Sequence, residues 1–117
     1  MYRIKIAGIY QIIHDSGYYY IGCSSDVVSR WSSHITLLKQ GTHHSIEFQQ
    51  LWNNSTPEEW VFRILKYISK TQLKRQCKLK GSQFEQHFRT RLLQEEKTIM
   101  KQWSINYCLN KNNKHFS

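Results

Sequence analysis

Hydrophobic residues near the N-terminus follow the pattern of a β-hairpin. Two short segments, residues 4–14 and 18–24, are rich in Ile and Tyr and flank the sequence Asp15-Ser16-Gly17. A three-residue loop with Gly in its last position is a favoured hairpin connection, because Gly accepts the left-handed conformation that closes the loop. We therefore expect the two segments to pair as antiparallel strands.

The length of this loop also determines which side chains share a face of the hairpin. Pairing His14 with Tyr18 places Tyr10 opposite Gly22, and Tyr20 then lies on the same face as Tyr10. Diagonal neighbours on one face are about 7–8 Å apart. The two phenols are therefore expected to converge on one spot, unless a bulge in the hairpin reverses the parity.

From Ser25 the periodicity changes from that of a strand to that of a helix. The apolar positions follow steps of three and four residues: Val27, Trp31, Ile35 and Leu38. Ser25 or Asp26 is a suitable N-cap, and Gly41 is a helix stop. Arg30 and His34 are four residues apart, so they stack on one side of the helix, where they are expected to overhang the two tyrosines.

The rest of the chain is predicted to hold two more helices and one more strand. A short helix is expected over residues 45–52, followed by a loop over 53–59, which contains the one proline of the chain. The apolar run at 60–68 predicts a third strand. Residues 69–82 hold five Lys or Arg and break the hydrophobic pattern, so a basic loop is expected there. A long helix follows over 83–103, with an apolar face formed by Phe84, Phe88, Leu92, Ile99 and Trp103.

One carboxylate of this last helix projects from its apolar face. The neighbours of Glu96 at three and four residues are Leu92, Leu93, Ile99 and Met100. Glu95 instead lies beside Arg91 and Thr98. A carboxylate among apolar side chains is costly to desolvate unless a cation or hydrogen-bond donors meet it. Glu96 is therefore either a metal ligand or the partner of an Arg or Lys in a structural ion pair.

Composition and charge narrow the classes of function. A chain of 117 residues is the size of one domain, so residues 1–117 are expected to form a single domain. The 39% hydrophobic and 14% aromatic fractions are typical of a folded chain. Lys and Arg total 17 against 8 Asp and Glu, a formal net charge of +9. Such a charge indicates nucleic acid as a partner, although an anionic membrane or an acidic protein also fits it.

The location expected for this chain is the interior of a cell. No run reaches the roughly 18 apolar residues of a membrane-spanning helix, and the N-terminus does not resemble a signal peptide. Cys23, Cys77 and Cys108 are odd in number and fit neither a disulfide framework nor a zinc site, so they are expected to be reduced.

Two tripeptides resemble the signature of a known enzyme family. Gly8-Ile9-Tyr10 and Tyr20-Ile21-Gly22 are similar to the paired motifs of the GIY-YIG nuclease superfamily. The resemblance continues in the family's order through residues 29–34, 41–46, Glu96 and 107–110. The opening, residues 8–12, is similar to that of its phage and intron-encoded homing endonucleases.

The resemblance implies a metal-dependent DNA endonuclease with the GIY-YIG fold. That fold is an α/β domain of the α+β type, with a small three-stranded antiparallel sheet flanked by helices. The implied catalytic residues are Tyr10, Tyr20, Arg30, His34 and Glu96, with Glu96 as the ligand of one Mg²⁺ or Mn²⁺ ion. Tyr10 is the implied general base, assisted by Arg30 and by a hydrogen bond to His34. The alternative is that His34 takes up the proton and the Tyr10 phenol only relays it.

The family also suggests residues that contact the DNA. His43 matches a histidine that lies near the phosphate in the family, and Asn110 is expected to support the site. The alternative is that neither has a role in the reaction: His43 then belongs to an ordinary loop, and Asn110 to a turn near the C-terminus. Residues 69–82 are longer than the homing pattern implies. Their cations are either a solvated loop or a strip of phosphate contacts, consisting of Lys70, Lys74, Arg75, Lys78 and Lys80.

Several biological roles remain open from the sequence. A phage, bacterial or mobile-element nuclease of the homing type is favoured, and a restriction or repair nuclease is the alternative. A DNA-binding module that does not cut and a basic protein-interaction domain are further possibilities. The expected partner is double-stranded DNA, bound by a monomer or by a transient dimer.

Overall fold

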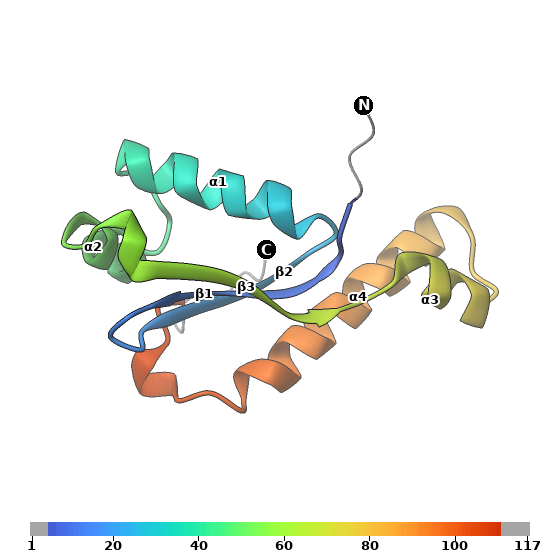
Figure 1. The fold of residues 1–117 in the computed structure, drawn as a ribbon. Coiled ribbons are helices and arrows are strands. Elements are labelled where there is room, and N and C mark those ends of the chain that lie inside the picture. The colour runs from blue at the N-terminus through green and yellow to red at the C-terminus, as the bar shows by residue number, and fades with distance from the viewer. Residues whose placement is uncertain (1–4, 111–117) are drawn as a thin grey trace.

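A three-stranded antiparallel sheet separates two groups of helices in the computed structural model, which describes residues 5–110 (Figure 1). The strands pair in the order β2-β1-β3, so β1 is central and the other two are edges. Helices α1 and α2 cover one face and α4 covers the other (Figure 1). The strands are β1 (Gly8–His14), β2 (Tyr19–Ser24) and β3 (Trp60–Tyr67). The α-helices are α1 (Val27–Gln40), α2 (Ile46–Asn53), α3 (Lys70–Gln76) and α4 (Gly81–Met100), with single 3-10 turns at Pro57–Glu59 and Ile105–Tyr107.

The hairpin of β1 and β2 has the register that the loop length predicts. Tyr10 pairs with Gly22 and Ile12 with Tyr20, without a break along the two strands. Gly17 closes the loop at φ 99°, the left-handed conformation expected of it. The irregularity of the sheet lies instead between β1 and β3, at Ile9 and Tyr10. The parity that places both tyrosines on one face is therefore confirmed.

Alternation along the strands divides the buried side chains into two cores. Odd-numbered residues of the hairpin face α4, and even-numbered residues face α1 and α2. The core on the α4 side includes Ile9, Tyr19, Ile21, Cys23, Phe84, Phe88 and Leu92. The core on the α1 side includes Tyr10, Ile12, Tyr20, Val27, Leu38, Phe48 and Trp60. Because β1 is covered on both faces, its residues from Gly8 to Ile12 are all buried.

Helix α1 begins and ends where its capping residues predict. The Asp26 side chain accepts a hydrogen bond from the Ser29 amide, and Gly41 ends the helix in the left-handed conformation at φ 76°. Its buried positions are Val27, His34 and Leu38. His34 thus lies on the buried line of the helix, whereas the sequence placed it at the border of the apolar stripe.

The expectation of a loop over residues 69–82 is wrong, because the segment contains helix α3. Ser69 caps the helix by accepting a hydrogen bond from the Gln72 amide at 3.1 Å. Leu73 is the one buried residue of α3, so the helix has no periodic apolar stripe that the sequence would reveal. Helix α4 also begins at Gly81 and ends at Met100, whereas residues 83–103 were expected.

Helix α3 folds back beside the first half of α4 (Figure 1). Lys70 forms an ion pair with Glu85 at 2.8 Å and lies over the ring of Phe88, with 5.4 Å from Nζ to the ring centroid. Lys74 lies over the ring of Phe84 in the same way, at 5.6 Å. Two of the five cations of this segment therefore stabilise the packing of α3 on α4. Within residues 5–110, none of the helices has the length and apolar character that a membrane span needs.

The outer edge of β2 is covered by the C-terminal part of the chain. The Leu109 amide donates to the Tyr19 carbonyl at 2.7 Å. Asn110 then uses its side-chain amide as a strand would, accepting from the Ile21 amide at 3.4 Å and donating to the Ile21 carbonyl at 2.7 Å. An edge strand whose backbone groups are paired in this way does not present a template for aggregation.

The contact between β1 and β3 makes Gly8 sensitive to substitution. A Cβ atom on Gly8 would overlap the backbone carbonyl oxygen of Lys66, which the neighbouring strand holds in place. We expect Gly8→Ala to lower the free energy of unfolding by about 3 kcal/mol, measured by urea denaturation. Gly41→Ala is the control, because a Cβ at Gly41 meets no atom within 4 Å and the left-handed backbone alone costs about 1 kcal/mol. Equal losses in the two variants would contradict this account.

Candidate active site

The two tyrosines of the hairpin lie together beneath α1, as their register requires. Their rings stack with centroids 6.5 Å apart and planes 15° apart. The Tyr10 hydroxyl is 2.7 Å from His34 Nε2, and the Tyr20 hydroxyl is 3.2 Å from His44 Nε2. Each phenol therefore has a histidine as its hydrogen-bond partner. The first pair is buried, and the second lies at the surface because His44 is exposed.

Gly22 provides the space that the Tyr10 ring occupies. A Cβ atom at position 22 would overlap the Tyr10 hydroxyl and lie 2.6 Å from its Cζ atom. The glycine of the second tripeptide is thus required by the tyrosine of the first. This contact explains why the two motifs are needed together on neighbouring strands.

A second histidine continues the contacts behind His34. His34 Nδ1 is 2.7 Å from His43 Nε2, and the Ser45 amide donates to His43 Nδ1 at 3.0 Å. Gln49 holds this loop by accepting from the His43 amide and donating to the Leu38 carbonyl, each at 3.0 Å. Both rings are thereby fixed between α1 and α2.

Burial keeps these histidines neutral at pH 7. Desolvation lowers the pKa of His34 to about 3, and repulsion from His43 and Arg30 adds to that effect. Desolvation and the neighbouring His44 lower the pKa of His43 to about 4. The pKa of His44 is also lowered, by its partial burial and by Arg30. Each ring then carries a single proton.

Glu96 lies on the other face of the sheet, at the edge of β2. It continues the buried row Phe84, Phe88 and Leu92 at four-residue steps and is 2% exposed. Its carboxylate accepts hydrogen bonds from the thiol and the backbone amide of Cys23. Burial raises the pKa of Glu96 to about 7, against the opposing effects of Cys23 and Arg30.

The ion pair that was one of the two interpretations of Glu96 is not found within residues 5–110. No Lys or Arg nitrogen of that part of the chain lies within 4.0 Å of its carboxylate. Glu95 has two such partners, Lys66 at 2.9 Å and Arg91 at 3.0 Å, and its pKa is lowered, chiefly by the hydrogen bond from Lys66. The two adjacent glutamates therefore have opposite environments.

Arg30 connects the tyrosine face with Glu96. The charge of its guanidinium acts on the Tyr10 phenol and also attracts the Glu96 carboxylate around the edge of β2. Within the described residues its buried Nε has no hydrogen-bond partner. A cavity of about 540 Å³ opens beside it, with Cys23, Ser25, Gln86 and Arg89 among its lining residues.

Burial dominates the protonation of Tyr10. The phenol is fully buried, and desolvation together with repulsion from Tyr20 raises its pKa well above 10. Arg30 opposes this shift by its positive charge, yet it does not overcome burial. Tyr10 is therefore a neutral phenol at pH 7 in the free protein.

The structure brings five of the sequence-predicted residues around the β2 edge: Tyr10, Tyr20, Arg30, His34 and Glu96. His43 and Asn110 lie behind them, 6% exposed each, and their side-chain polar atoms are engaged with neighbouring protein groups. Sequence reasoning missed His44 and Cys23. The first adjoins His43 at the start of α2, and the second follows Gly22 on β2, so nearness to the motifs is the only signal that the sequence offers.

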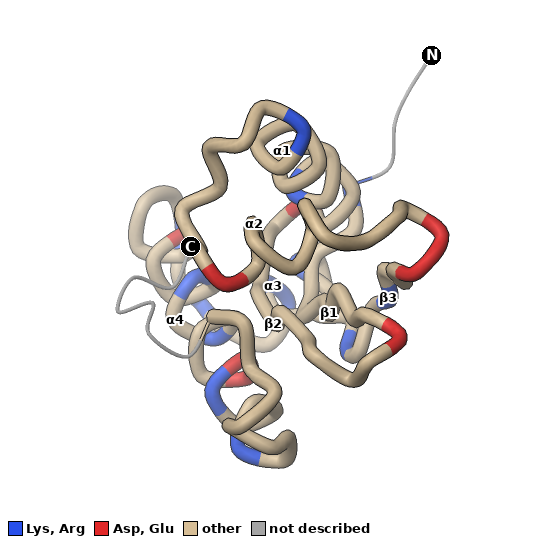
Figure 2. Tube along the Cα trace, turned by 90° about the vertical axis from the view of Figure 1, so that its left-hand side faces the viewer, with Lys and Arg blue, Asp and Glu red and all other residues tan. Residues whose placement is uncertain are grey.

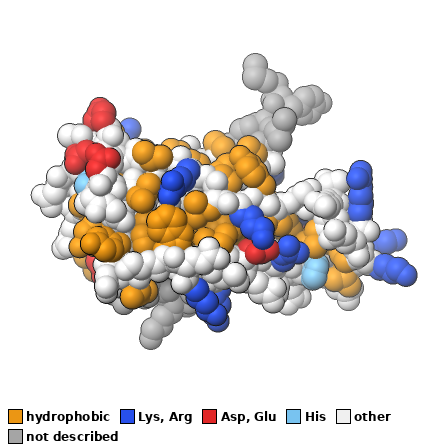
Figure 3. All heavy atoms as spheres, turned by 60° about the horizontal axis from the view of Figure 1, so that its bottom comes forward, with side chains coloured by type: hydrophobic (Ala, Val, Ile, Leu, Met, Phe, Trp, Pro, Cys, Tyr) orange, Lys and Arg blue, Asp and Glu red, His pale blue; other side chains and the backbone are white. Residues whose placement is uncertain are grey.

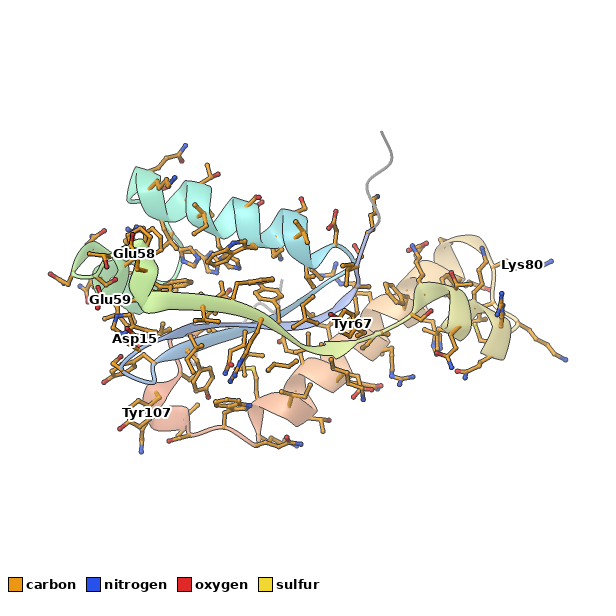
Figure 4. The ribbon with its side chains drawn as sticks, in the orientation of Figure 1. Asp15, Glu58, Glu59, Tyr67, Lys80 and Tyr107 are labelled. Carbon is orange, nitrogen blue, oxygen red and sulfur yellow. The ribbon has the colours of Figure 1, made fainter. Side chains whose placement is uncertain are left out.

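The basic segment lies at one end of the molecule, away from the tyrosines. Figure 3 shows Lys and Arg side chains projecting from the end formed by α3 and the start of α4. In Figure 4, Lys80 points outward at this end, whereas Asp15, Glu58 and Glu59 lie at the opposite end. Figure 2 shows Lys and Arg positions along α1, α3 and α4. The charge of the protein is therefore unevenly distributed.

Comparison with known proteins places this chain in a family. The family model described as the GIY-YIG catalytic domain matches residues 6–102. The chain belongs to the GIY-YIG family and is a nuclease. A comparison with curated proteins gave no match.

Two solved structures of one endonuclease are similar to this chain. A mutant of the catalytic domain of intron endonuclease I-TevI shares 30% identity, with a TM-score of 0.51 over 61% of this chain and 75% of that one. The catalytic domain of homing endonuclease I-TevI has a TM-score of 0.63 at 24% identity, over 87% of this chain and 96% of that one. The α+β fold with its three-stranded antiparallel sheet is thus the fold of that catalytic domain.

The raised pKa of Glu96 makes stability depend on pH in a direction that can be tested. The folded protein holds this proton up to pH about 7, whereas an unfolded Glu releases it near pH 4.3, so the contribution of Glu96 to stability is lost as pH rises from about 4.5 to 7. Without divalent ions, Glu96→Gln is therefore expected to exceed the natural chain in unfolding free energy by about 3 kcal/mol at pH 8. The difference should shrink towards pH 5.

Comparison with the natural chain removes the contribution of the histidines to the pH dependence of stability. The lowered pKa values of His34 and His43 reduce stability as pH falls below about 6.5, but they do so equally in both proteins. The difference between the two denaturation curves therefore isolates Glu96. A difference that stays constant from pH 5 to pH 8 would show that the carboxylate is not perturbed.

Proposed function

We propose that this nuclease is a metal-dependent endonuclease of the homing type that hydrolyses phosphodiester bonds of double-stranded DNA. The observation that carries the proposal is the buried Glu96 carboxylate, which forms no ion pair within 4.0 Å among residues 5–110 and lies across the β2 edge from Tyr10. Arg30 stands between them, next to an open cavity. The similarity to I-TevI supports the homing type.

Glu96 is suited to hold one Mg²⁺ or Mn²⁺ ion. No three His, Cys, Asp or Glu side chains of the described residues are grouped as a metal site. A single buried carboxylate fits a hard ion that takes water and substrate phosphate as its other ligands. The ion would supply Lewis-acid stabilisation of the phosphate and the leaving oxygen. Affinity without DNA is expected to be low, because one carboxylate is the only charged ligand.

Arg30 is the residue placed to hold the scissile phosphate. Its unpartnered Nε and its position between Tyr10 and Glu96 suit a clamp on the charge that develops in the transition state. For Tyr10 to act as the base, its phenol proton would first pass to solvent water. The phenolate, stabilised by the hydrogen bond from His34 and by the charge of Arg30, would then accept a proton of the attacking water. Tyr20, with His44, orients the water or the phosphate.

His43 and Asn110 support the site from behind rather than touching the phosphate. The polar atoms of both side chains are satisfied by protein groups, so each would have to leave its partner to contact DNA. Asn110 fixes the edge of β2 next to Cys23, and His43 fixes His34. Their substitution is expected to act through the geometry of the site.

Cleavage of supercoiled plasmid tests the function. We expect the natural chain to nick the plasmid with Mg²⁺ or Mn²⁺, and Glu96→Ala and Tyr10→Phe to slow nicking at least 100-fold while they still bind DNA. One site cuts one strand, so linear product would require a second chain or a second binding event. Intact plasmid at every metal and salt concentration, but retarded on a gel, would make this chain a DNA-binding module.

The basic segment is proposed to bind the DNA backbone outside the cleavage site. Lys70 and Lys74 are engaged with α4, whereas Arg75, Lys78 and Lys80 are exposed cations. Each neutralised phosphate contributes salt-sensitive affinity. The exposed three are therefore the principal candidates for phosphate contacts, and Lys70 and Lys74 act mainly by holding α3 in place.

The salt dependence of DNA binding distinguishes these roles. Replacing Arg75, Lys78 and Lys80 by Gln is expected to reduce the slope of log affinity against log salt by about 2–3. Lys101→Gln is the control, because Lys101 follows Met100 at the other end of the 20-residue helix α4, about 30 Å away. A slope that the triple variant leaves unchanged would contradict the proposed contacts.

A further inference from the structure

A continuous chain of hydrogen bonds runs from the start of α2 to the Tyr10 hydroxyl. The Ser45 amide contacts His43 Nδ1 at 3.0 Å. His43 Nε2 contacts His34 Nδ1 at 2.7 Å, and His34 Nε2 contacts Tyr10 Oη at 2.7 Å. All four residues are at most 6% exposed, so solvent does not compete for these bonds.

The backbone amide at one end determines the direction of every bond in this chain. An amide nitrogen only donates, so His43 Nδ1 must accept and carries no proton. A neutral imidazole without a proton on Nδ1 has it on Nε2, which therefore donates to His34 Nδ1. By the same rule, His34 holds its own proton on Nε2 and donates to Tyr10. The reverse direction would place two protons between His43 Nδ1 and the Ser45 amide.

The Ser45 amide is itself held in place by independent contacts. The Ser45 hydroxyl donates to the Leu109 carbonyl at 2.6 Å and accepts from the Phe48 amide at 3.3 Å as the N-cap of α2. Gln49 fixes the backbone of His43 by accepting a hydrogen bond from its amide. Neutral rings are also consistent with burial, which keeps the pKa values of His34 and His43 at about 3 and 4.

We propose that His43 is a positioning residue which, through this one-way chain, fixes His34 as a hydrogen-bond donor to Tyr10. His34 then has no free nitrogen to receive the Tyr10 proton, so it is not a proton relay for that phenol. The Tyr10 proton points away from His34. His34 donates to the oxygen and the positive charge of Arg30 acts on it from nearby, an arrangement that favours the phenolate.

The role of this hydrogen-bond chain in catalysis rests on the proposed function, in which Tyr10 is the general base. The hydrogen bonds and tautomers themselves can be tested without measuring cleavage. With ¹⁵N-labelled histidine, long-range ¹H–¹⁵N correlation spectra distinguish the two neutral tautomers of each ring. We expect His34 and His43 to be protonated on Nε2 at pH 7, with a coupling across the bond from His43 Nε2 to His34 Nδ1. A proton on Nδ1 of either ring would overturn the proposal, whether or not the protein cuts DNA.

Two variants of His43 test its role in the reaction. His43→Gln keeps an amide that donates near the position of Nε2, whereas His43→Leu removes the donor from His34 Nδ1. We expect His43→Gln to cleave within a few-fold of the natural rate and to keep the Nε2 tautomer of His34. His43→Leu should lower kcat about 100-fold with little change in KM.

A folding defect in His43→Leu is separated from a positioning effect by its circular dichroism and its melting curve. If that variant does not fold, the tautomer of His34 in the natural chain and in His43→Gln decides the question. Cleavage by a folded His43→Leu at the natural rate would overturn the proposal. If the natural chain itself does not cut, the spectra still establish or refute the chain of hydrogen bonds.

Discussion

The site depends on the packing of the Tyr10 ring against Gly22 on the neighbouring strand. The three-residue hairpin loop sets this pairing, and the absence of a side chain at Gly22 allows the phenol to lie directly over β2. The same register stacks Tyr20 beside Tyr10 and turns Cys23 to the opposite face. A shift of one residue would exchange the two faces and separate the phenols from the histidines.

The site is built around the edge of β2 and uses both faces of the sheet. The tyrosines and histidines belong to the α1 side, and Glu96 belongs to the α4 side. An edge strand makes this arrangement possible, because its outward backbone groups are free to meet side chains: the Asn110 amide at Ile21 and the Glu96 carboxylate at Cys23. The charge of Arg30 lowers the pKa of Tyr10 on one face and of Glu96 on the other, so it couples the two groups electrostatically.

Burial exceeds local charge in setting the protonation of this site. It raises the pKa of Tyr10 and of Glu96 although Arg30 acts in the opposite direction on both, and it lowers the pKa of both buried histidines. The free protein therefore holds a neutral phenol, neutral imidazoles and a carboxyl group that readily keeps its proton. Binding of a cation at this site would lower the pKa of both Tyr10 and Glu96 and so favour their ionised forms.

Elements with local signals can be predicted from the amino-acid sequence. The hairpin register follows from loop length, the ends of α1 follow from Asp26 and Gly41, and the inward position of Glu96 follows from helical phase. The features that join distant segments become visible only in the folded protein: the helix α3, which the buried Leu73 anchors, and the contacts of His43 with His34 and of Asn110 with Ile21. These contacts depend on where helices and strands meet in space, whereas hydrophobic periodicity indicates only which face of each element is buried.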